Sequence, residues 1–567
     1  MINKVKLDIK NYLNTEFLNQ FNTDINFVVE EPKRKDQGDL SIPSFLVAKA
    51  LGLKLPEVVE KIKEALLNAP FSNIIESVNI MGGFVNISLS RVGLSKNIVD
   101  QLLAEEEIGK NDIFKGEVVC LDYSAPNIAK SFSIGHLRST ILGHAIANIF
   151  EKCSAKTVRI NHLGDYGTQF GKLIYAYLNF SSEDKVKADP INELVRVYVL
   201  FHELAENDPT MDDKAREIFK ELENGNPKYV EIWKWFREES LKEFMKMYDM
   251  LNVHFDSYNG ESFYVDKMGP VVDELNEKEL LVLDDGARIV KLDNDMPPAI
   301  IQKNDGSTLY FTRELAAVFY RKNTYNFTRC LYVVGNEQKL HFEQMRQVID
   351  KMGHDFKDQI AHVNFGLVLQ GGKKMSTRKG RAVKLIDVLN EAIQMSLNYI
   401  NEKNSTLENK EEVAKKIGVS AVIFNDLKNY RANDFEFDLE SMLKYEGQTG
   451  PYLQYTSVRI NSILKESEID YANIDYSLYA QDHYFDILKE ISSYKSVLAK
   501  AAQEYAPSVL AKYLLNLAAL FNTFYAKEKI NVENELEKNT KKVLLYLVRE
   551  VLNDGMKLLG MSIVEKM

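Results

Sequence analysis

The strongest constraint on the fold lies at residues 117–150, where a strand-like run passes directly into a helix-like run. Residues 117–123 have the apolar, β-branched character of a buried strand, and apolar residues recur at helical spacing over 137–150. Gly135 and His136 stand at the junction. A helix start presents unpaired backbone N–H groups and the positive end of the dipole, so it binds phosphate. The junction therefore predicts a nucleoside triphosphate site, with close approach at Gly135 and a hydrogen bond from His136.

A second basic segment lies far downstream, at residues 371–381 (Gly-Gly-Lys-Lys-Met-Ser-Thr-Arg-Lys-Gly-Arg). Its charge is opposite to that of the whole chain, which has a formal net charge of −11. Its glycines and cations are suited to a mobile clamp over a polyphosphate. A solvated basic loop is the alternative interpretation of this segment taken alone.

Together, the two segments resemble the signature motifs of class I aminoacyl-tRNA synthetases. The first motif corresponds to Ser-Ile-Gly-His at 133–136 and the second to Lys-Met-Ser-Thr-Arg at 374–378. The surrounding sequence is similar to that of arginyl-tRNA synthetases, at Ser-Ala-Pro-Asn-Ile-Ala-Lys (124–130), Gly-His-Leu-Arg-Ser-Thr (135–140) and Asn-His-Leu-Gly-Asp-Tyr-Gly-Thr-Gln-Phe-Gly (161–171). The likeness extends nearly from end to end, and three long, ordered matches are far more specific than one short pattern.

The sequence pattern predicts three domains within an α/β fold. Residues 1–112 form a small α/β domain with a strand at 84–89, and 391–567 form an all-α bundle without strands. Between them, 113–390 alternate strands and helices as a Rossmann-like parallel sheet does, with helical insertions at about 180–300. The expected elements of this region are strands at 117–123, 157–161, 280–283, 288–292, 308–312, 330–335 and 362–366, and helices at 136–151, 185–250, 314–325 and 340–352. Ligands bind at the carboxyl ends of parallel strands, so residues after 123, 161, 312 and 335 should converge.

The resemblance implies an arginine–tRNA ligase. Such an enzyme joins arginine to the α-phosphate of ATP, releases pyrophosphate and transfers the arginyl group to the 3′-terminal ribose of tRNA(Arg), with Mg²⁺ accompanying ATP. It also implies a tRNA-contacting N-terminal domain, an anticodon-binding C-terminal bundle and a monomer. Two alternatives stay open: a catalytically impaired paralogue that binds arginine or tRNA, and a nucleotidyl transferase of the same fold with another acceptor.

Positioning and charge neutralisation carry the activation step. Ser133 stands where the family has histidine, and a serine before a helix is typical of an N-cap. The second motif lacks its usual second lysine, and Lys130 occupies the place from which a lysine is thought to substitute. The catalytic residues implied by the resemblance are Lys130, Ser133, Gly135, His136 and Lys374, and the ATP-binding residues are Gly135, His136, Gly164, Asp165, Gln169, His341, Gln344, Lys374, Met375, Ser376 and Arg378.

Selection of arginine requires carboxylates near a guanidinium, because planar acceptors match a planar five-donor cation. The arginine-binding residues implied by family position are Asp122, Asn127, Tyr310, Glu314 and Gln338. Most relatives carry aspartate at the position of Glu314. An acidic residue in the first turn of a helix is also favoured by the helix dipole, which is the alternative interpretation of Glu314.

In the C-terminal bundle, Tyr452, Gln454, Tyr455, Arg459, Asn522 and Tyr525 offer aromatic and polar side chains that could read anticodon bases. Aromatic residues at helical spacing are equally typical of a packed core.

Bulk properties indicate a cytoplasmic protein without a membrane partner. No run of about twenty apolar residues occurs, and the first eight residues lack the apolar stretch of a secretion signal. Three cysteines lie far apart without zinc-site or disulfide spacing, so we expect buried small apolar side chains and no metal held by the protein itself.

Overall fold

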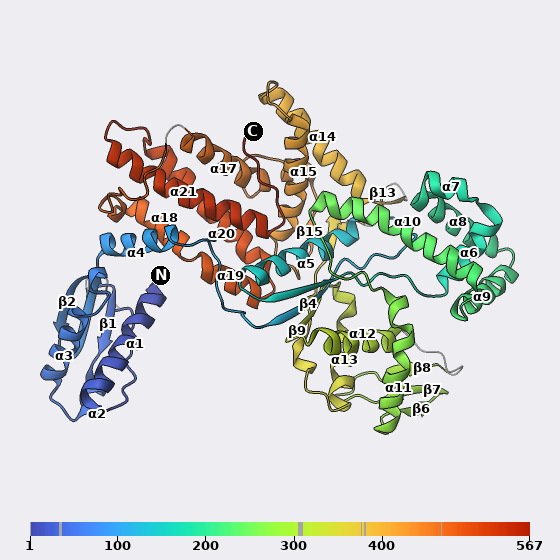
Figure 1. Cartoon of the computed structure of the whole chain (residues 1–567), viewed down its shortest axis with the longest axis horizontal. Helices are drawn as coiled ribbons and strands as arrows, with labels where there is room; N and C mark the ends of the chain where they lie inside the picture. The colour runs from blue at the N-terminus through green and yellow to red at the C-terminus, as the bar shows by residue number, and fades with distance from the viewer. Residues whose placement is uncertain are drawn as a thin grey trace. The chain divides into compact units, whose positions relative to one another are not determined.

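The computed structural model describes residues 2–32, 34, 37–303, 310–375, 377–378, 381–465 and 468–567. The chain divides into two compact units, which are described separately (Figure 1). The first unit comprises Met1–Gly109, Arg459–Ser496 and Leu515–Asp554, and the second comprises Lys110–Val458, Val497–Leu514 and Gly555–Met567.

The N-terminal part of the first unit is a three-stranded antiparallel sheet covered by helices. The sheet has the order β1-β3-β2 and includes the predicted strand at 84–89 as β3. The fully buried Ile9, Leu13 and Phe17 recur every fourth residue on α1, which places them on one face toward the sheet. The bounds are α1 Ile2–Phe21, β1 Leu40–Pro43, α2 Phe45–Leu51, α3 Leu55–Leu67, β2 Ile75–Met81, β3 Phe84–Leu89 and α4 Arg91–Leu103.

The second unit is built on a parallel sheet with the strand order β10-β9-β4-β5. Cys120 of β4 lies between Val158 of β5 and Cys330 of β9 in parallel register. These strands confirm the predicted ones at 117–123, 157–161 and 330–335 within a few residues, whereas the strand predicted at 362–366 lies earlier, at 360–362, and overlaps the prediction only at His362. The bounds are β4 Val118–Asp122, α5 Ile134–Lys152, β5 Lys156–Ile160, β9 Arg329–Tyr332, α13 Lys339–Lys351 and β10 Ile360–His362.

Close packing between α5 and β4 depends on Gly143. A Cβ atom at Gly143 would lie 2.2 Å from the ring of the buried Tyr123, so a larger residue would push the helix away from the strand end. The helix that begins at the predicted phosphate site is therefore fixed close against the sheet.

The predicted strand at 308–312 is wrong where the structure describes it. Residues 308 and 309 lie outside the described residues, and Tyr310 begins helix α12, Tyr310–Tyr325. Apolar and β-branched residues over five positions fit either element, and the helix is decided by packing that sequence does not reveal. Thr312 donates a hydrogen bond at 2.6 Å to the Ile301 carbonyl of β8, in a small antiparallel sheet of β6 Val282–Asp284, β7 Ala287–Val290 and β8 Ala299–Gln302.

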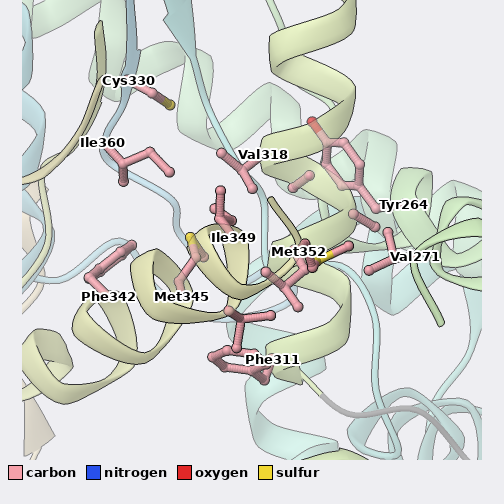
Figure 2. Packing of buried hydrophobic residues seen from close by; sticks show 14 of the residues in the cluster. Tyr264, Val271, Phe311, Val318, Cys330, Phe342, Met345, Ile349, Met352 and Ile360 are labelled. Atoms are coloured by element: carbon pink, nitrogen blue, oxygen red, sulfur yellow. The ribbon is translucent and has the colours of Figure 1, made fainter. Parts of the chain in front are cut away.

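A hydrophobic core lies between the parallel sheet and the helices α11 (Met268–Glu277), α12 and α13 (Figure 2). One face of α13 contributes Phe342, Met345 and Ile349 to this core, and Met352 follows at the end of the helix. Their spacing of three and four residues places them on the same side of the helix. They pack with strand residues and with α11 and α12. As expected, the three cysteines are unpaired and buried, at Cys120, Cys153 and Cys330.

The insertion predicted at 185–250 is a group of helices, with α10 the longest (Figure 1). The helices of this part are α6 Gln169–Phe180, α7 Glu183–Ala188, α8 Pro190–Ala205, α9 Thr210–Glu223, α10 Pro227–Leu251 and a 3₁₀ helix, η3, Glu261–Lys267.

Among the described residues after 390, the regular elements are helices apart from one short strand that the sequence did not indicate. β15, Phe435–Glu436, pairs in parallel with β11, Val368–Gln370. The helices are α14 Leu385–Lys403, α15 Lys410–Leu427, α16 Leu439–Met442, α17 Gly450–Leu464, α18 Asp482–Ser492, α19 Tyr494–Gln503, α20 Pro507–Lys527 and α21 Glu535–Leu558. By length and composition α20 could span a membrane, but it carries many buried core residues, as core helices of globular proteins also do.

Candidate active site

The chain that follows the second basic segment meets the start of α5 along a short backbone seam. The N–H of Ile134 donates to the Val383 carbonyl at 3.0 Å, and the N–H of Leu385 donates to the Phe132 carbonyl at 3.0 Å. Ser133 and Lys384 thereby form an antiparallel bridge between the start of α5 and the chain that follows the second motif. Segments far apart in sequence therefore share one side of the second unit.

Ser133 caps α5, as its sequence position indicates. Its backbone N–H donates to Nδ1 of His136 at 3.0 Å, so Nδ1 accepts and the neutral ring carries its proton on Nε2. Burial lowers the pKa of His136 to about 4, and the nearby Lys130 acts in the same direction. His136 is therefore a neutral donor at physiological pH, next to the ammonium of Lys130.

The loop between β4 and α5 holds three non-glycine residues in left-handed backbone conformations. These are Ser124 (φ 72°), Ala125 (φ 43°) and Ala129 (φ 57°). Ser139 on α5 accepts a hydrogen bond from the Ser124 N–H, and Ser240 on α10 accepts one from the Ala129 N–H, both at 2.9 Å. Such strain costs about 1–3 kcal/mol per residue and gathers at functional sites. The sequence did not indicate this feature.

The second motif follows a tight hairpin. β11 pairs with β12, Lys373–Lys374, through a turn in which Gly371 (φ 61°) and Gly372 (φ 71°) adopt conformations that favour glycine. The carboxylate of Glu436 on β15 accepts hydrogen bonds from both glycine N–H groups. Lys374 is exposed and Met375 is buried. Arg378 lies on β13, Thr377–Arg378, which pairs with β14, Arg381–Ala382, whereas Ser376 and Lys379 lie outside the described residues.

A buried charged network lies at the end of β4. Asp122 forms an ion pair with Arg321 of α12, whose Nη2 is 2.7 Å from Oδ2 of Asp122. The same Nη2 lies 3.0 Å from Nδ1 of His162, and Nε2 of His162 lies 3.3 Å from Oε1 of Glu314. All four side chains are buried. The sequence indicated Asp122 and Glu314 as arginine-binding residues and His162 only as part of the 161–171 loop. It did not indicate Arg321, although a cation was to be expected beside two buried acids.

Glu314 and Tyr310 lie on the first turns of α12 rather than at a strand end. Burial raises the pKa of Glu314 to about 7, and the charge of Asp122 acts in the same direction. The Glu314 carboxylate raises the pKa of Tyr310, which is 44% exposed. Burial also raises the pKa of Glu261 to about 7. The charge of Arg313, whose Nη2 lies 3.4 Å from Oε2 of Glu261, acts in the opposite direction but is the smaller effect. This acidic group suits a cationic ligand with the exposed Tyr310 ring at its edge.

The loop at 161–171 is fastened to the loop after β4. Asn127 and Gly164 form a parallel bridge, and a Cβ atom at Gly164 would lie 2.1 Å from Oδ1 of Asn127. The fully buried Asp165 carboxylate accepts hydrogen bonds from Ser262 and pairs with Arg237 at 2.9 Å. The Asp165 side chain is thus committed to holding this loop in place.

Beside this loop opens a cavity of about 670 Å³, which the sequence did not indicate. Phe170, Phe219 and Trp233 supply apolar lining, and the Asp165–Arg237 pair supplies polar lining.

The remaining predicted ligand residues lie on or near α13, apart from Gln169 at the start of α6. His341 packs its ring against Tyr310 and Phe311, with centroids 5.3 Å apart in each case. Gln344 donates to the Pro297 carbonyl at 2.8 Å, and Gln338 lies in a 3₁₀ turn before α13. Gln169 donates to the Tyr166 carbonyl at 3.1 Å. The structure therefore brings His341 next to Tyr310, while Gln344 and Gln169 make contacts within the chain.

The predicted tRNA-binding residues fall into different environments. Arg459 donates to Asn522 at 3.1 Å and lies 5.5 Å from the Tyr525 ring centroid, so these three form one cluster. Tyr455 is 39% exposed, whereas Gln454 is buried and donates to the Ser562 carbonyl at 2.7 Å. Gln454 therefore lies in the packed core, which was the alternative interpretation of these C-terminal residues. Tyr452, on the same helix, is partly buried.

Comparison with known proteins places this arrangement in a class. Residues 98–439 match the family model "tRNA synthetases class I (R), catalytic domain". Residues 3–89 match "Arginyl tRNA synthetase N terminal domain", and residues 453–567 match "DALR anticodon binding domain". The parallel sheet, in which the start of α5 is bridged to the chain that follows the second motif, has the fold of class I aminoacyl-tRNA synthetases.

Relatives specify the family within this class. The chain is 46% identical to arginine–tRNA ligase of Latilactobacillus sakei over 95% of both chains, and 46% identical to that of Enterococcus faecalis over 96% of both. The solved arginyl-tRNA synthetase of Plasmodium falciparum aligns with a TM-score of 0.76 at 27% identity, covering 100% of this chain and 99% of that one. The chain belongs to the arginyl-tRNA synthetase family. These comparisons do not support the impaired-paralogue alternative.

Proposed function

We propose that this chain joins arginine to tRNA(Arg) in two steps at the seam between the start of α5 and the chain that follows the second motif. A carboxylate oxygen of arginine attacks the α-phosphorus of ATP, and the bond to the β-phosphate breaks, releasing pyrophosphate. A ribose hydroxyl of tRNA then attacks the arginyl carbonyl carbon, its proton is lost and AMP departs. The observation that carries this proposal is the Ser133–Lys384 bridge, which joins the start of α5 to the chain that follows the second motif.

ATP would lie over the start of α5. Nε2 of the neutral His136 would donate to phosphate, and Lys130 and Lys374 would neutralise its charge. Gly135 and Gly164 would allow close approach, while His341 would face the nucleoside. Met375, Ser376 and Arg378 would complete the nucleotide site. The described residues contain no group of three His, Cys, Asp or Glu that could hold a metal, so Mg²⁺ would enter with ATP, held by its phosphates.

Arginine would lie between the loop after β4 and α12. Glu314 would meet the guanidinium, Tyr310 would stack on it, and Asp122, Asn127 and Gln338 would complete the polar surroundings. Because Glu314 is buried beside Asp122, a neutral side chain such as that of citrulline would leave an uncompensated charge there.

We further propose a tRNA-contacting domain at 1–112, a catalytic domain at 113–390 and an anticodon-binding domain at 391–567. Anticodon bases would contact the cluster of Arg459, Asn522 and Tyr525. The exposed Tyr455 is a separate candidate for base stacking. The protein would act as a monomer in the cytoplasm, as expected of a translation enzyme with this composition.

The proposal is tested by charging of tRNA(Arg) with purified protein, using arginine against lysine and citrulline. Arginine alone should be attached, and His136→Ala should reduce the rate by about 100-fold or more. His202→Ala, at an exposed position on α8, is the matched control and should charge normally. Full charging by His136→Ala would contradict the phosphate role, and absence of charging by the unmodified protein would contradict the function.

A further inference from the structure

The network around Glu314 has a fixed hydrogen-bond direction. Arginine side chains only donate, so Nδ1 of His162 must accept the bond from Nη2 of Arg321. Burial lowers the pKa of His162 well below its ordinary value, so the ring is neutral. A neutral ring that accepts at Nδ1 carries its proton on Nε2. The Nε2–H group is therefore on the side of Glu314.

His162 is held in this orientation by Arg321 at Nδ1 and by Tyr264 against the face of its ring. Its ring stacks on Tyr264 at an interplanar angle of 13° and a centroid distance of 5.3 Å. The 3.3 Å between Nε2 and Oε1 of Glu314 is within reach of a hydrogen bond, although the two groups are not aligned as one. Catalytic hydrogen bonds often tighten only when the ligand binds.

Arg321 already neutralises one of the two acids. Its charge pairs with Asp122 at 2.7 Å, so Glu314 is the acid left for a cationic ligand. The charged and titratable groups that face Glu314 come from β4, the loop after β5, η3, α12 and β9, and they are Asp122, His162, Glu261, Tyr310, Arg321 and Tyr332.

We propose that Arg321 is a positioning residue that acts through His162: it fixes the Nε2–H tautomer, and His162 in turn orients the Glu314 carboxylate toward the guanidinium of the substrate. This rests on the proposed function, in which Glu314 binds that guanidinium. Without the Arg321 bond, the ring could place a lone pair toward Glu314 instead of a donor.

The test uses two variants of His162 in the full-length protein. His162→Phe keeps a flat ring against Tyr264 but removes both nitrogen atoms. His162→Gln restores one acceptor and one donor on a flexible side chain. Both leave the Asp122–Arg321 pair intact, whereas Arg321→Met would leave Asp122 as an unpaired buried charge and could prevent folding.

His162→Phe should raise KM for arginine about tenfold or more while KM for ATP stays as in the unmodified protein. His162→Gln should recover much of the loss. In the unmodified protein, kcat/KM for arginine should fall as pH drops through about 7, where Glu314 takes up a proton. In His162→Phe this limb should move to higher pH, because the carboxylate has lost a donor.

An unchanged KM for arginine in His162→Phe would overturn the proposal. So would an equal rise in KM for ATP, or a His162→Gln variant no better than His162→Phe, since either would indicate a packing role only. These outcomes are read against an unmodified protein that charges arginine; its failure to do so would instead contradict the proposed function.

Discussion

Arg138 and Asp426 form a buried ion pair between α5 and α15. Nε of Arg138 donates to Oδ1 of Asp426 at 3.1 Å, and both side chains are 1% exposed. Arg138 also donates to the Asn433 carbonyl at 3.0 Å and lies 5.0 Å from the Phe435 ring centroid. The helix that begins at the phosphate site is thereby tied to the segment that carries β15.

Arg138→Met should lower the free energy of unfolding by about 3–5 kcal/mol, because Asp426 would remain as an unpaired buried charge. Arg138→Met combined with Asp426→Leu should recover part of this loss, since both polar partners are then removed together. Urea denaturation of the single and double variants measures the effect. A double variant no more stable than the single one would contradict the interpretation.

Glu436→Ala should loosen the hairpin before the second motif, because the N–H groups of Gly371 and Gly372 lose their acceptor. We expect kcat to fall about three- to tenfold, since exposed hydrogen bonds contribute about 0.5–1.5 kcal/mol each. The thermal midpoint should hardly change. Glu440→Ala, which removes another exposed carboxylate nearby, is the control, and equal losses in both variants would argue against a specific role.

Gly164→Ala should weaken arginine binding, because its Cβ atom would lie 2.1 Å from Oδ1 of Asn127 and displace that side chain. An increase of about tenfold or more in KM for arginine is expected, as small misplacements of positioning groups are costly. Gly269→Ala has no atom within 4 Å of its Cβ and should leave the kinetics unchanged. Steady-state kinetics decide, and normal KM in Gly164→Ala would show that Asn127 is dispensable.

His136 should stay neutral across the physiological range, because its pKa is lowered to about 4. Because the pKa of His136 is lower in the folded state than in the unfolded state, where it is near 6.5, the unfolded state binds the proton more readily. The stability of the folded state is therefore fully present above pH 6.5 and decreases as pH falls toward 4. Imidazole NMR signals of His136, assigned with His136→Gln, should show a proton on Nε2 and no titration between pH 6 and 8. Titration near 6.5 would refute this assignment.

Tyr525→Ala should raise KM for tRNA with little change in KM for arginine or ATP, because base stacking contributes about 1–3 kcal/mol per base. Gln454→Ala should instead destabilise the fold, since this buried side chain satisfies the Ser562 carbonyl. Charging kinetics and thermal melting separate the two effects. A normal KM for tRNA in Tyr525→Ala would remove this ring from the proposed interface.

Much of the fold could be predicted because its signals are local. The buried strand at 118–122 and the amphipathic spacing of α13 are visible in short windows of sequence. The start of α12 at Tyr310 was missed because a five-residue apolar run fits a strand as well as a helix. β15 was missed because two residues carry no periodicity, and pairing with β11 alone makes them a strand.

Site residues could be predicted where they lie in a family motif. They could not be predicted where their role depends on contacts between residues far apart in the sequence. His136 and Glu314 could be named from their surroundings in sequence, but the role of His162 depends on Arg321, which is 159 residues away. Likewise, the sequence fitted Gln454 to a recognition surface and to a packed core equally, and only the structure reveals its buried bond to Ser562. Spacing therefore indicates which groups carry charge, and tertiary contacts decide which of them a ligand can reach.

The Ser133–Lys384 bridge has a consequence for tolerance to insertions. The bridge holds Ser133 and Lys384 next to each other, although the chain between them includes the helices α6–α10. These helices can therefore become longer or shorter without moving Ser133 and Lys384 apart. A chain nicked in a loop between α6 and α10 should still assemble the nucleotide site, whereas a nick next to Ser133 or Lys384 should disrupt it.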